Sequence, residues 1–343
     1  MRYGASMTAY KRRDHHKSGG FRNPPDHYFP DRRFSRVGRW EYWSFMLRRV
    51  VKASKPPPVP VDHVIAEDLA LAGLVAHQGA DSITWLGHAA FLLRLQGVTV
   101  LLDPYLGARA SPVGIMGPKR FVPPAIAPER LPPIDVMAVS HNHYDHLCVP
   151  TLARLNGGER TTAIVPLGLK RYFLNRPWAS VHEVDWGDSV RVGEVTMTAM
   201  PALHWSRRGM WDVNRTLWVS YVIASPQLKI YFTGDTGYGP MFQRIGESHG
   251  PFDLALVPIG SYQPASIMRR HHTTPEEAVN IGRDAGARAM VGMHWGTVIL
   301  TDEPPFEPPE RFRAAAALAG YAPENAWVMR IGETRALKPW PGN

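Results

Sequence analysis

The chain has 343 residues, of which 44% are hydrophobic and 10% aromatic, so it can bury a sizeable core and an ordinary globular class is expected. Its single cysteine, Cys148, excludes an intrachain disulfide and a cysteine-rich zinc site. Any metal therefore has to be bound by histidine and carboxylate groups. The net charge of +9 indicates attraction to an acidic partner, for which nucleic acid, an anionic membrane face and a phosphate-bearing substrate all qualify.

The first residues are basic, but no continuous apolar stretch follows them as a secretory signal would require. No apolar run in the sequence is long enough to span a bilayer. These two features predict a cytoplasmic protein, with attachment to the inner face of a membrane left open.

Residues 1–75 form an extension that is richer in arginine, aromatic residues and proline than residues 76–343. Its stretch Lys55–Pro60 is stiff and is interpreted as a linker. Ahead of this linker, apolar residues recur at helical spacing between basic ones: Trp40, Trp43, Leu47, Val50 and Val51. Two interpretations stay open: a basic amphipathic helix on an anionic bilayer, and a helix that docks its tryptophan stripe on its own domain.

Short β-rich runs separated by turn signals follow the extension and predict a chain that builds sheets. The expected strands are Ser82–Leu86, Ala90–Leu95, Val98–Leu102, Ile134–Ser140, Thr161–Val165, Val195–Met200, Leu217–Ala224 and Leu228–Thr233. A capping box with proline at the first helical position, Thr274–Glu277, predicts a helix that ends at Gly286. An alanine-rich helix is expected over Glu310–Ala319. Strands in both halves with helices between them predict sheets covered by helices.

The segment Ser140–His146 carries the sharpest chemical signal, because His141, His143, Asp145 and His146 follow an apolar strand run. A loop with three imidazoles and a carboxylate at alternate and adjacent positions can bring them into one small volume. Imidazole nitrogen and carboxylate oxygen suit zinc and similar ions, so this spacing predicts a metal site.

Three further candidate ligands, His204, Asp235 and His294, each come shortly after a β-like run. A single histidine in such a place is more often structural than ligating. Strand ends at one edge of a sheet commonly converge on a site, so their joint occurrence strengthens the prediction.

The order H-x-H-x-D-H, then His, then Asp in Gly-Asp-Thr, then His resembles the signature of the metallo-β-lactamase superfamily. The resemblance implies an α/β fold, an αββα sandwich with the N-terminal extension 1–75 and a hydrolase domain over 76–343. It also implies two zinc ions per chain. One is implied to be held by His141, His143 and His204, the other by Asp145, His146 and His294, with Asp235 as a bridge.

A narrower resemblance is to N-acylphosphatidylethanolamine-hydrolysing phospholipase D (NAPE-PLD), a family that acts on phospholipids. It is carried by Phe21–Pro24, Trp85–Ala89, Arg109–Pro112, Met116–Phe121, Leu131–Asp135, Gly234–Tyr238, Gly250–Leu254 and His294–Thr297. It implies hydrolysis of the lipid to an N-acylethanolamine and phosphatidic acid, and a homodimer. The region between Asn23 and about Ala76 matches the family poorly.

Two zinc ions can lower the pKa of a bridging water and clamp the oxygens of a phosphodiester, so the expected nucleophile is a metal-bridging hydroxide. Asp145, Asp235 and His272 are the candidate catalytic residues. His272 matches a family position and is expected to contact the phosphate or the leaving oxygen, with a structural role as the alternative. His88 and Asp103 are interpreted as supports that hydrogen-bond a ligating imidazole.

Other functions remain open from the sequence. The same metal site could act on a lactone or on another phosphodiester, because fold does not fix function. A non-enzymatic module that uses its basic surface is the remaining alternative. The expected partners are a phospholipid and a membrane surface, with no nucleic acid.

Overall fold

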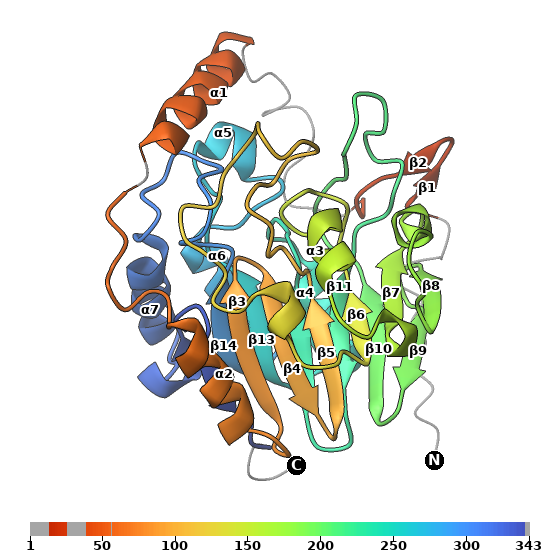
Figure 1. The fold of residues 1–343 in the computed structure, drawn as a ribbon. Coiled ribbons are helices and arrows are strands. Elements are labelled where there is room, and N and C mark those ends of the chain that lie inside the picture. Colours follow the sequence, from red (N-terminus) through yellow and green to blue (C-terminus); the bar gives the residue numbers. More distant parts are fainter. Residues whose placement is uncertain (1–13, 26–38, 56, 340–343) are drawn as a thin grey trace.

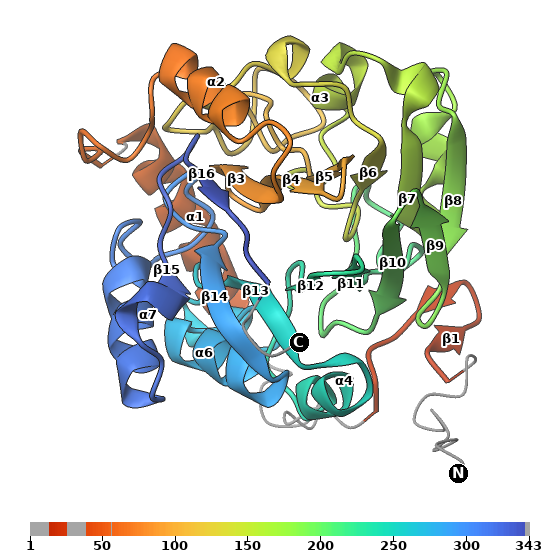
Figure 2. The ribbon, with the colours of Figure 1, turned by 90° about the horizontal axis from the view of Figure 1, so that it is seen from below.

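A computed structural model describes residues 14–25, 39–55 and 57–339 of the chain (Figure 1). Two seven-stranded mixed sheets pack face to face, and helices cover the outer face of each sheet (Figure 2). The fold is therefore the α/β sandwich of the metallo-β-lactamase type that the sequence predicts.

The first sheet is built mainly from the N-terminal half of the chain and has the strand order β16-β3-β4-β5-β6-β7-β8. Strands β16 to β5 pair antiparallel, whereas β5, β6, β7 and β8 pair parallel. Its strands are β3 (Ser82–Gly87), β4 (Ala90–Leu95), β5 (Val98–Leu102), β6 (Val136–Ala138), β7 (Thr162–Pro166), β8 (Ser180–Val184) and β16 (Thr334–Ala336).

The second sheet has the order β15-β14-β13-β12-β11-β10-β9. Here β9 to β12 pair antiparallel, and β12, β13, β14 and β15 pair parallel. Its strands are β9 (Ser189–Val192), β10 (Val195–Met200), β11 (Ser220–Ala224), β12 (Lys229–Phe232), β13 (Phe252–Pro258), β14 (Ala287–Met293) and β15 (Ala326–Trp327). Each sheet thus contains a block of parallel strands whose carboxyl ends share one edge.

The helices form the two outer layers. Helices α2 (Glu67–Ala76) and α3 (Val149–Arg154) lie over the first sheet, and α4 (Met241–His249), α6 (Pro275–Asp284) and α7 (Pro308–Leu318) lie over the second (Figure 2). Two more helices, α1 (Arg39–Ser54) and α5 (Ala265–Met268), and a small hairpin of β1 (His16–Lys17) and β2 (Gly20–Phe21), lie outside the sandwich.

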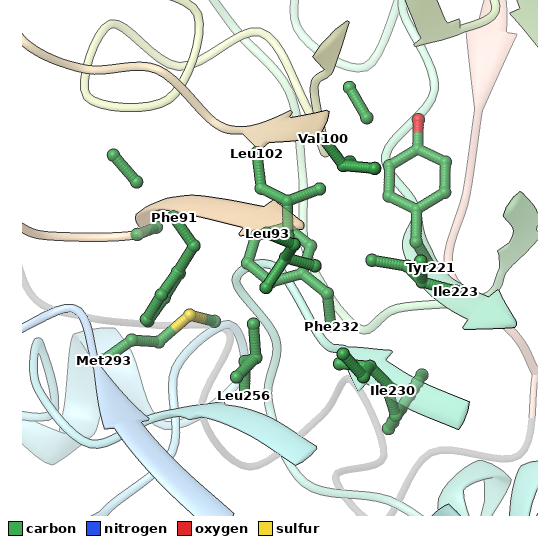
Figure 3. Packing of buried hydrophobic residues seen from close by; sticks show 14 of the residues in the cluster. Phe91, Leu93, Val100, Leu102, Tyr221, Ile223, Ile230, Phe232, Leu256 and Met293 are labelled. Atoms are coloured by element: carbon green, nitrogen blue, oxygen red, sulfur yellow. The ribbon is translucent and has the colours of Figure 1, made fainter. Parts of the chain in front are cut away.

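The core lies between the two sheets, where apolar side chains from both inner faces meet. Phe91 and Leu93 of β4 face Ile230 and Phe232 of β12 and Leu256 of β13, and all five are at most 2% exposed (Figure 3). Burial of apolar side chains on this scale contributes about 1.5–3 kcal/mol for each of them. The stability that this core provides can offset the cost of burying polar groups at the edge of the sandwich.

Most of the expected elements are present. All eight predicted strands occur, although β6 covers only three of the seven residues expected over Ile134–Ser140. The flanking residues still bond the neighbouring strands in part, since Asp135 N donates to the Thr99 carbonyl of β5 and Val139 N donates to the Ile164 carbonyl of β7. The capping box of α6 is confirmed, since the Thr274 hydroxyl accepts from the Glu277 N–H while the Glu277 carboxylate accepts from the Thr274 N–H.

Helix α1 tests one of the two interpretations of the extension, the docking of its tryptophan stripe on the domain. Trp40 and Trp43 are 84% and 62% exposed, whereas Phe45 is 2% exposed and faces the domain. The interpretation in which the tryptophan stripe docks on its own domain is therefore wrong. The side chain of Val50 and the whole of Pro56 lie outside the described residues.

Candidate metal centre

The predicted site residues gather where strands of both sheets end. Asp103 follows β5, the segment His141–His146 follows β6, Asp235 follows β12 and His294 follows β14, and these four strands belong to the two parallel blocks. His204 comes from the loop after β10. The site is thus built from loops on rigid strand ends, the usual arrangement of functional sites in such folds.

Three imidazoles form a first cluster, with His143 in the middle. The Nδ1 atom of His143 lies 2.8 Å from the Nε2 atom of His141 and 3.2 Å from the Nε2 atom of His204. The three ligand atoms are close enough together to surround one ion. They are the residues expected to hold one metal.

A second cluster lies beside the first and is formed by His88, Asp145, His146 and His294. The Oδ2 atom of Asp145 lies 3.7 Å from the Nε2 atom of His146 and 3.5 Å from the Nε2 atom of His294. Three of these four are the residues expected to hold the other metal.

The Asp235 carboxylate lies between the two clusters. Its Oδ2 atom is 3.0 Å from His146 Nε2 and 3.1 Å from His294 Nε2 in the second cluster. The same atom is 3.9 Å from His204 Nε2 and 4.0 Å from His141 Nε2 in the first. This is the place that a bridging ligand would take.

The chemistry of these donors fits a pair of cations. The Oδ1 atom of Asp235 is buried without a hydrogen-bond partner among the described residues. Burial opposes charge here, yet the carboxylates of Asp235, Asp103 and Asp145 hold the pKa of His146 well above its usual value. The imidazoles likewise outweigh burial and hold the pKa of Asp235 well below its usual range. Positive charge is therefore stabilised beside Asp235 in the second cluster, whereas burial lowers the pKa of the three imidazoles of the first cluster and keeps them neutral, the form that binds a metal.

Comparison with known proteins identifies the family. A profile described as "Beta-lactamase superfamily domain" matches residues 98–295, which is more than half of the chain. The chain belongs to the metallo-β-lactamase superfamily. Together with the buried histidine and aspartate clusters, this makes it a metal-dependent hydrolase of that fold.

Individual relatives refine this likeness. An uncharacterised protein of Mycobacterium tuberculosis is 39% identical over 274 residues, which cover 76% of this chain and 71% of the relative. The Caenorhabditis elegans protein N-acyl-phosphatidylethanolamine-hydrolyzing phospholipase D 1 is 39% identical over 268 residues, 74% of this chain and 73% of the relative. The metallo hydrolase Igni18 of Ignicoccus hospitalis shares the fold, with a TM-score of 0.57 and 21% identity over 76% of this chain and 99% of Igni18.

Hydrogen bonds from neighbouring residues orient the imidazoles of this metallo-β-lactamase centre. Asp103 Oδ2 accepts from His146 Nδ1 at 2.6 Å, as the sequence analysis expected of this residue. The carbonyl oxygen of His271 lies 2.9 Å from His204 Nδ1, and the Ser261 hydroxyl lies 3.2 Å from His294 Nδ1. With the outer nitrogen engaged in this way, each ring directs Nε2 towards the centre.

His88 makes a different contact from the one expected. Its Nε2 atom lies 2.9 Å from Asp145 Oδ2, so it hydrogen-bonds a carboxylate and not an imidazole. Burial, followed by the nearby His294, lowers the pKa of His88 to about 3. The ring is therefore neutral and donates its Nε2 proton, which orients the Asp145 carboxylate.

His272 lies at the rim of the centre, in a group with His204 and Asp235 whose ligand atoms are mutually close. Its ring centroid is 5.2 Å from that of His204 and 5.5 Å from that of His294. Its Nδ1 atom is buried and has no hydrogen-bond partner among the described residues. Burial lowers its pKa to about 4, so the ring is neutral near neutral pH.

Some residues of the site were not singled out from the sequence. The His271 carbonyl, Ser261 and Asn23 all contact ligands. Asn23 lies in the Phe21–Pro24 stretch of the family resemblance, but no pattern in the sequence assigned this role to any of the three. These contacts depend on the tertiary structure, which brings the three residues next to the ligands.

Proposed function

We propose that the chain is a two-zinc phosphodiesterase of the phospholipase D type. It hydrolyses N-acylphosphatidylethanolamine to an N-acylethanolamine and phosphatidic acid. The observation that carries the proposal is the pair of buried ligand clusters with Asp235 between them. The choice of lipid is supported by the likeness to the C. elegans phospholipase D, at 39% identity over 74% of this chain.

The ligand chemistry favours zinc, because all seven groups offer imidazole nitrogen or carboxylate oxygen. His141, His143 and His204 would hold one ion, Asp145, His146 and His294 the other, and Asp235 both. When bound, such a pair supplies a hydroxide nucleophile at neutral pH and stabilises the charge that develops on the phosphoryl oxygens.

The chain's own residues do the positioning. Asp103 fixes the tautomer of His146 through its hydrogen bond to Nδ1, and His88 fixes the orientation of Asp145. His272 is neutral, and its Nδ1 atom at the rim has no partner in the described part of the chain, so it is placed to hydrogen-bond a phosphoryl or leaving-group oxygen. If it does so, His272→Ala lowers turnover far more than metal content, whereas equal loss of both indicates a structural role.

The surface around this edge suits a lipid interface. Helix α1, the loop between β5 and β6 and the loop between β10 and β11 rise above the same edge of the sandwich (Figure 1). Exposed large apolar side chains cluster on them: Trp40, Trp43, Leu47, Val51, Val113, Ile115, Met116, Met210, Trp211 and Val213. The described residues contain no helix that is both long and apolar enough to cross a bilayer. Apolar insertion together with the net charge of +9 is the pattern of a peripheral membrane protein.

The membrane part of the proposal can be tested by vesicle sedimentation. The variant Trp40→Ala/Trp43→Ala is expected to bind vesicles of anionic phospholipid at least about tenfold more weakly, because two interfacial tryptophans are lost. Leu318→Ala is a matched control, since Leu318 is 91% exposed and is the last residue of α7, which covers the second sheet below the edge that α1 rises above. Unchanged vesicle binding of the tryptophan variant, or equal binding to oligonucleotides, would count against a membrane partner.

The activity is tested by loading the protein with zinc and supplying N-acylphosphatidylethanolamine in mixed micelles, with products identified by mass. Release of an N-acylethanolamine, and its loss in Asp235→Asn, supports the proposal. Cleavage of lactones or of simpler phosphodiesters, with the lipid untouched, would keep the metal centre and replace the substrate. Loss of every hydrolytic activity in fully metallated protein would leave the non-enzymatic alternative.

A further inference from the structure

Residues 14–25 form a strap that runs from the far edge of the second sheet to the metal centre. The strap begins with the β1–β2 hairpin, which is closed by a hydrogen bond from Arg22 N to the His15 carbonyl at 2.9 Å. Phe21 N donates to the Asn214 carbonyl at 2.8 Å. Gly20 permits this close approach, because a Cβ atom there would lie 2.1 Å from the same carbonyl oxygen.

The strap is anchored at its beginning by a histidine pair on one carboxylate. His15 Nε2 lies 2.6 Å from Asp185 Oδ1, and His16 Nε2 lies 2.8 Å from Asp185 Oδ2. The His15 ring also stacks on Trp186, with centroids 4.0 Å apart. His15, His16 and Asp185 are close enough together to hold a cation. A cation bound to His15 Nε2, however, would force the ring proton onto Nδ1. That atom is buried without a partner among the described residues, so the pattern fits a hydrogen-bonded anchor better than a third metal site.

The other end of the strap reaches a metal ligand. The side-chain oxygen Oδ1 of Asn23 accepts from the backbone N–H of His204 at 3.0 Å and from Trp218 Nε1 at 3.0 Å. His204 and Trp218 are 0% and 1% exposed, so bulk water does not reach these two donors while Asn23 covers them. The Trp218 indole also donates to the Ala202 carbonyl at 2.9 Å, whereas the His204 N–H has no other acceptor among the described residues.

We propose that Asn23 is a positioning residue for the metal ligand His204, and that the strap is a structural part of the metal centre. This proposal rests on one part of the proposed function, the binding of metal at the site, and does not depend on the lipid substrate. His204 is held at two points, its backbone by Asn23 and its ring by the His271 carbonyl. Loss of the first leaves a buried N–H unpaired and frees the loop that carries the ligand. Comparable losses around ligating histidines weaken metal binding about ten- to a hundredfold.

The test measures metal binding and not only activity. Asn23→Ala is compared with Asn23→Asp, which keeps an acceptor oxygen, and with Asn156→Ala, whose amide contacts the Glu129 carbonyl away from the site. Zinc retained per chain is measured against a graded chelator, and the visible spectrum of the cobalt-loaded protein reports the ligand field. We expect Asn23→Ala to bind one of its two ions about ten- to a hundredfold more weakly. Asn23→Asp and Asn156→Ala should stay near wild type.

Wild-type affinity for both ions in Asn23→Ala would overturn the proposal, as would an equal loss in Asn156→Ala. If Asn23→Ala fails to fold, Asp185→Asn loosens the strap without touching Asn23. The same ion must then be weakened in that variant, and unchanged binding contradicts the proposal. If the wild-type protein binds metal but does not cleave the lipid, the proposed substrate is wrong and the proposal for Asn23 still stands. Absence of metal binding in wild type removes both.

Discussion

Replacing Asp103 with asparagine should weaken the binding of one of the two metal ions. The carboxylate is fully buried and accepts three hydrogen bonds: from Ser140 N at 2.6 Å, from the Ser140 hydroxyl at 2.5 Å and from His146 Nδ1 at 2.6 Å. Oδ1 serves the first of these, and Oδ2 serves the other two. Asparagine offers the same shape with only one acceptor oxygen, so one side of the group must change from acceptor to donor.

The magnitude follows from which side is lost. If the amide nitrogen of Asp103→Asn faces Ser140 N, two donors oppose each other in a dry site. If it faces His146, the Nδ1 proton is displaced and the ring protonates on Nε2, the atom directed at the metal. Each lost bond to a charged acceptor is worth about 1.5–3 kcal/mol. Supports of this kind change metal affinity about ten- to a hundredfold, equivalent to about 1.4–2.8 kcal/mol.

The assay is competition for zinc with a coloured chelator at neutral pH, followed by thermal melting of the metal-free protein. Asp135→Asn is the matched control, because Asp135 Oδ2 accepts from Thr99 N at 2.8 Å at the opposite end of β5. We expect Asp103→Asn to lose affinity for one ion while Asp135→Asn keeps both. An Asp103→Asn protein that melts earlier yet holds both ions as tightly as wild type would refute the assignment of a supporting role.

Three further changes test the fold around the site. Thr274→Ala removes the capping box of α6 and should lower the free energy of unfolding by about 1 kcal/mol in urea titrations. Gly260→Ala would place a Cβ atom 2.2 Å from the His294 carbonyl oxygen, so it should destabilise the fold and reduce zinc content together, in contrast to Thr274→Ala. Burial alone would raise the pKa of Asp185, but the hydrogen bonds from His15 and His16 outweigh burial, and the pKa is lowered. The stability that this pair contributes is present above the unfolded pKa of about 3.8 and is lost as the pH falls through the lower folded value. Asp185→Asn should therefore unfold more easily than wild type at pH 7, and this difference should shrink as the pH falls below 3.8 towards the lower folded pKa of Asp185.

The strands that could be predicted from the sequence are those that show a clean β pattern between turn signals. The predicted bounds coincide with β4 and β5 for Ala90–Leu95 and Val98–Leu102, because the Gln96–Gly97 turn marks the end of the first strand and the start of the second. Strand β13 was not predicted, although Phe252–Pro258 is buried throughout. A strand covered on both faces has no alternation, so its run reads equally well as a buried helix segment.

The sequence predicts the members of the candidate site, and the structure brings them together, but the contacts among them could not be predicted. Each of the seven proposed ligands follows an apolar run, which the sequence shows directly. The division into two clusters came from the family resemblance and not from spacing. Contacts such as Asn23 to His204 join residues 181 positions apart, and only the packed sheets bring them together. A sequence contains no local signal for such a partner.

Backbone strain gathers at the same edge as the ligands. Among the described non-glycine residues with positive φ, four lie at the centre: His88 (56°), Asp103 (38°), Ser261 (66°) and His294 (65°). Conformations of this kind cost about 1–3 kcal/mol each and persist only where the surrounding structure fixes them. Here His294 N donates to the His88 carbonyl at 3.0 Å, so two of the strained residues hold each other. A regular strand would alternate its side chains between the two faces of the sheet, and the sharp turn at the strand end is what directs these groups into one volume. The apolar core between the sheets supplies the stability that such a turn costs, which explains why the ligands sit on the strand ends of the sandwich and not on its exposed helices.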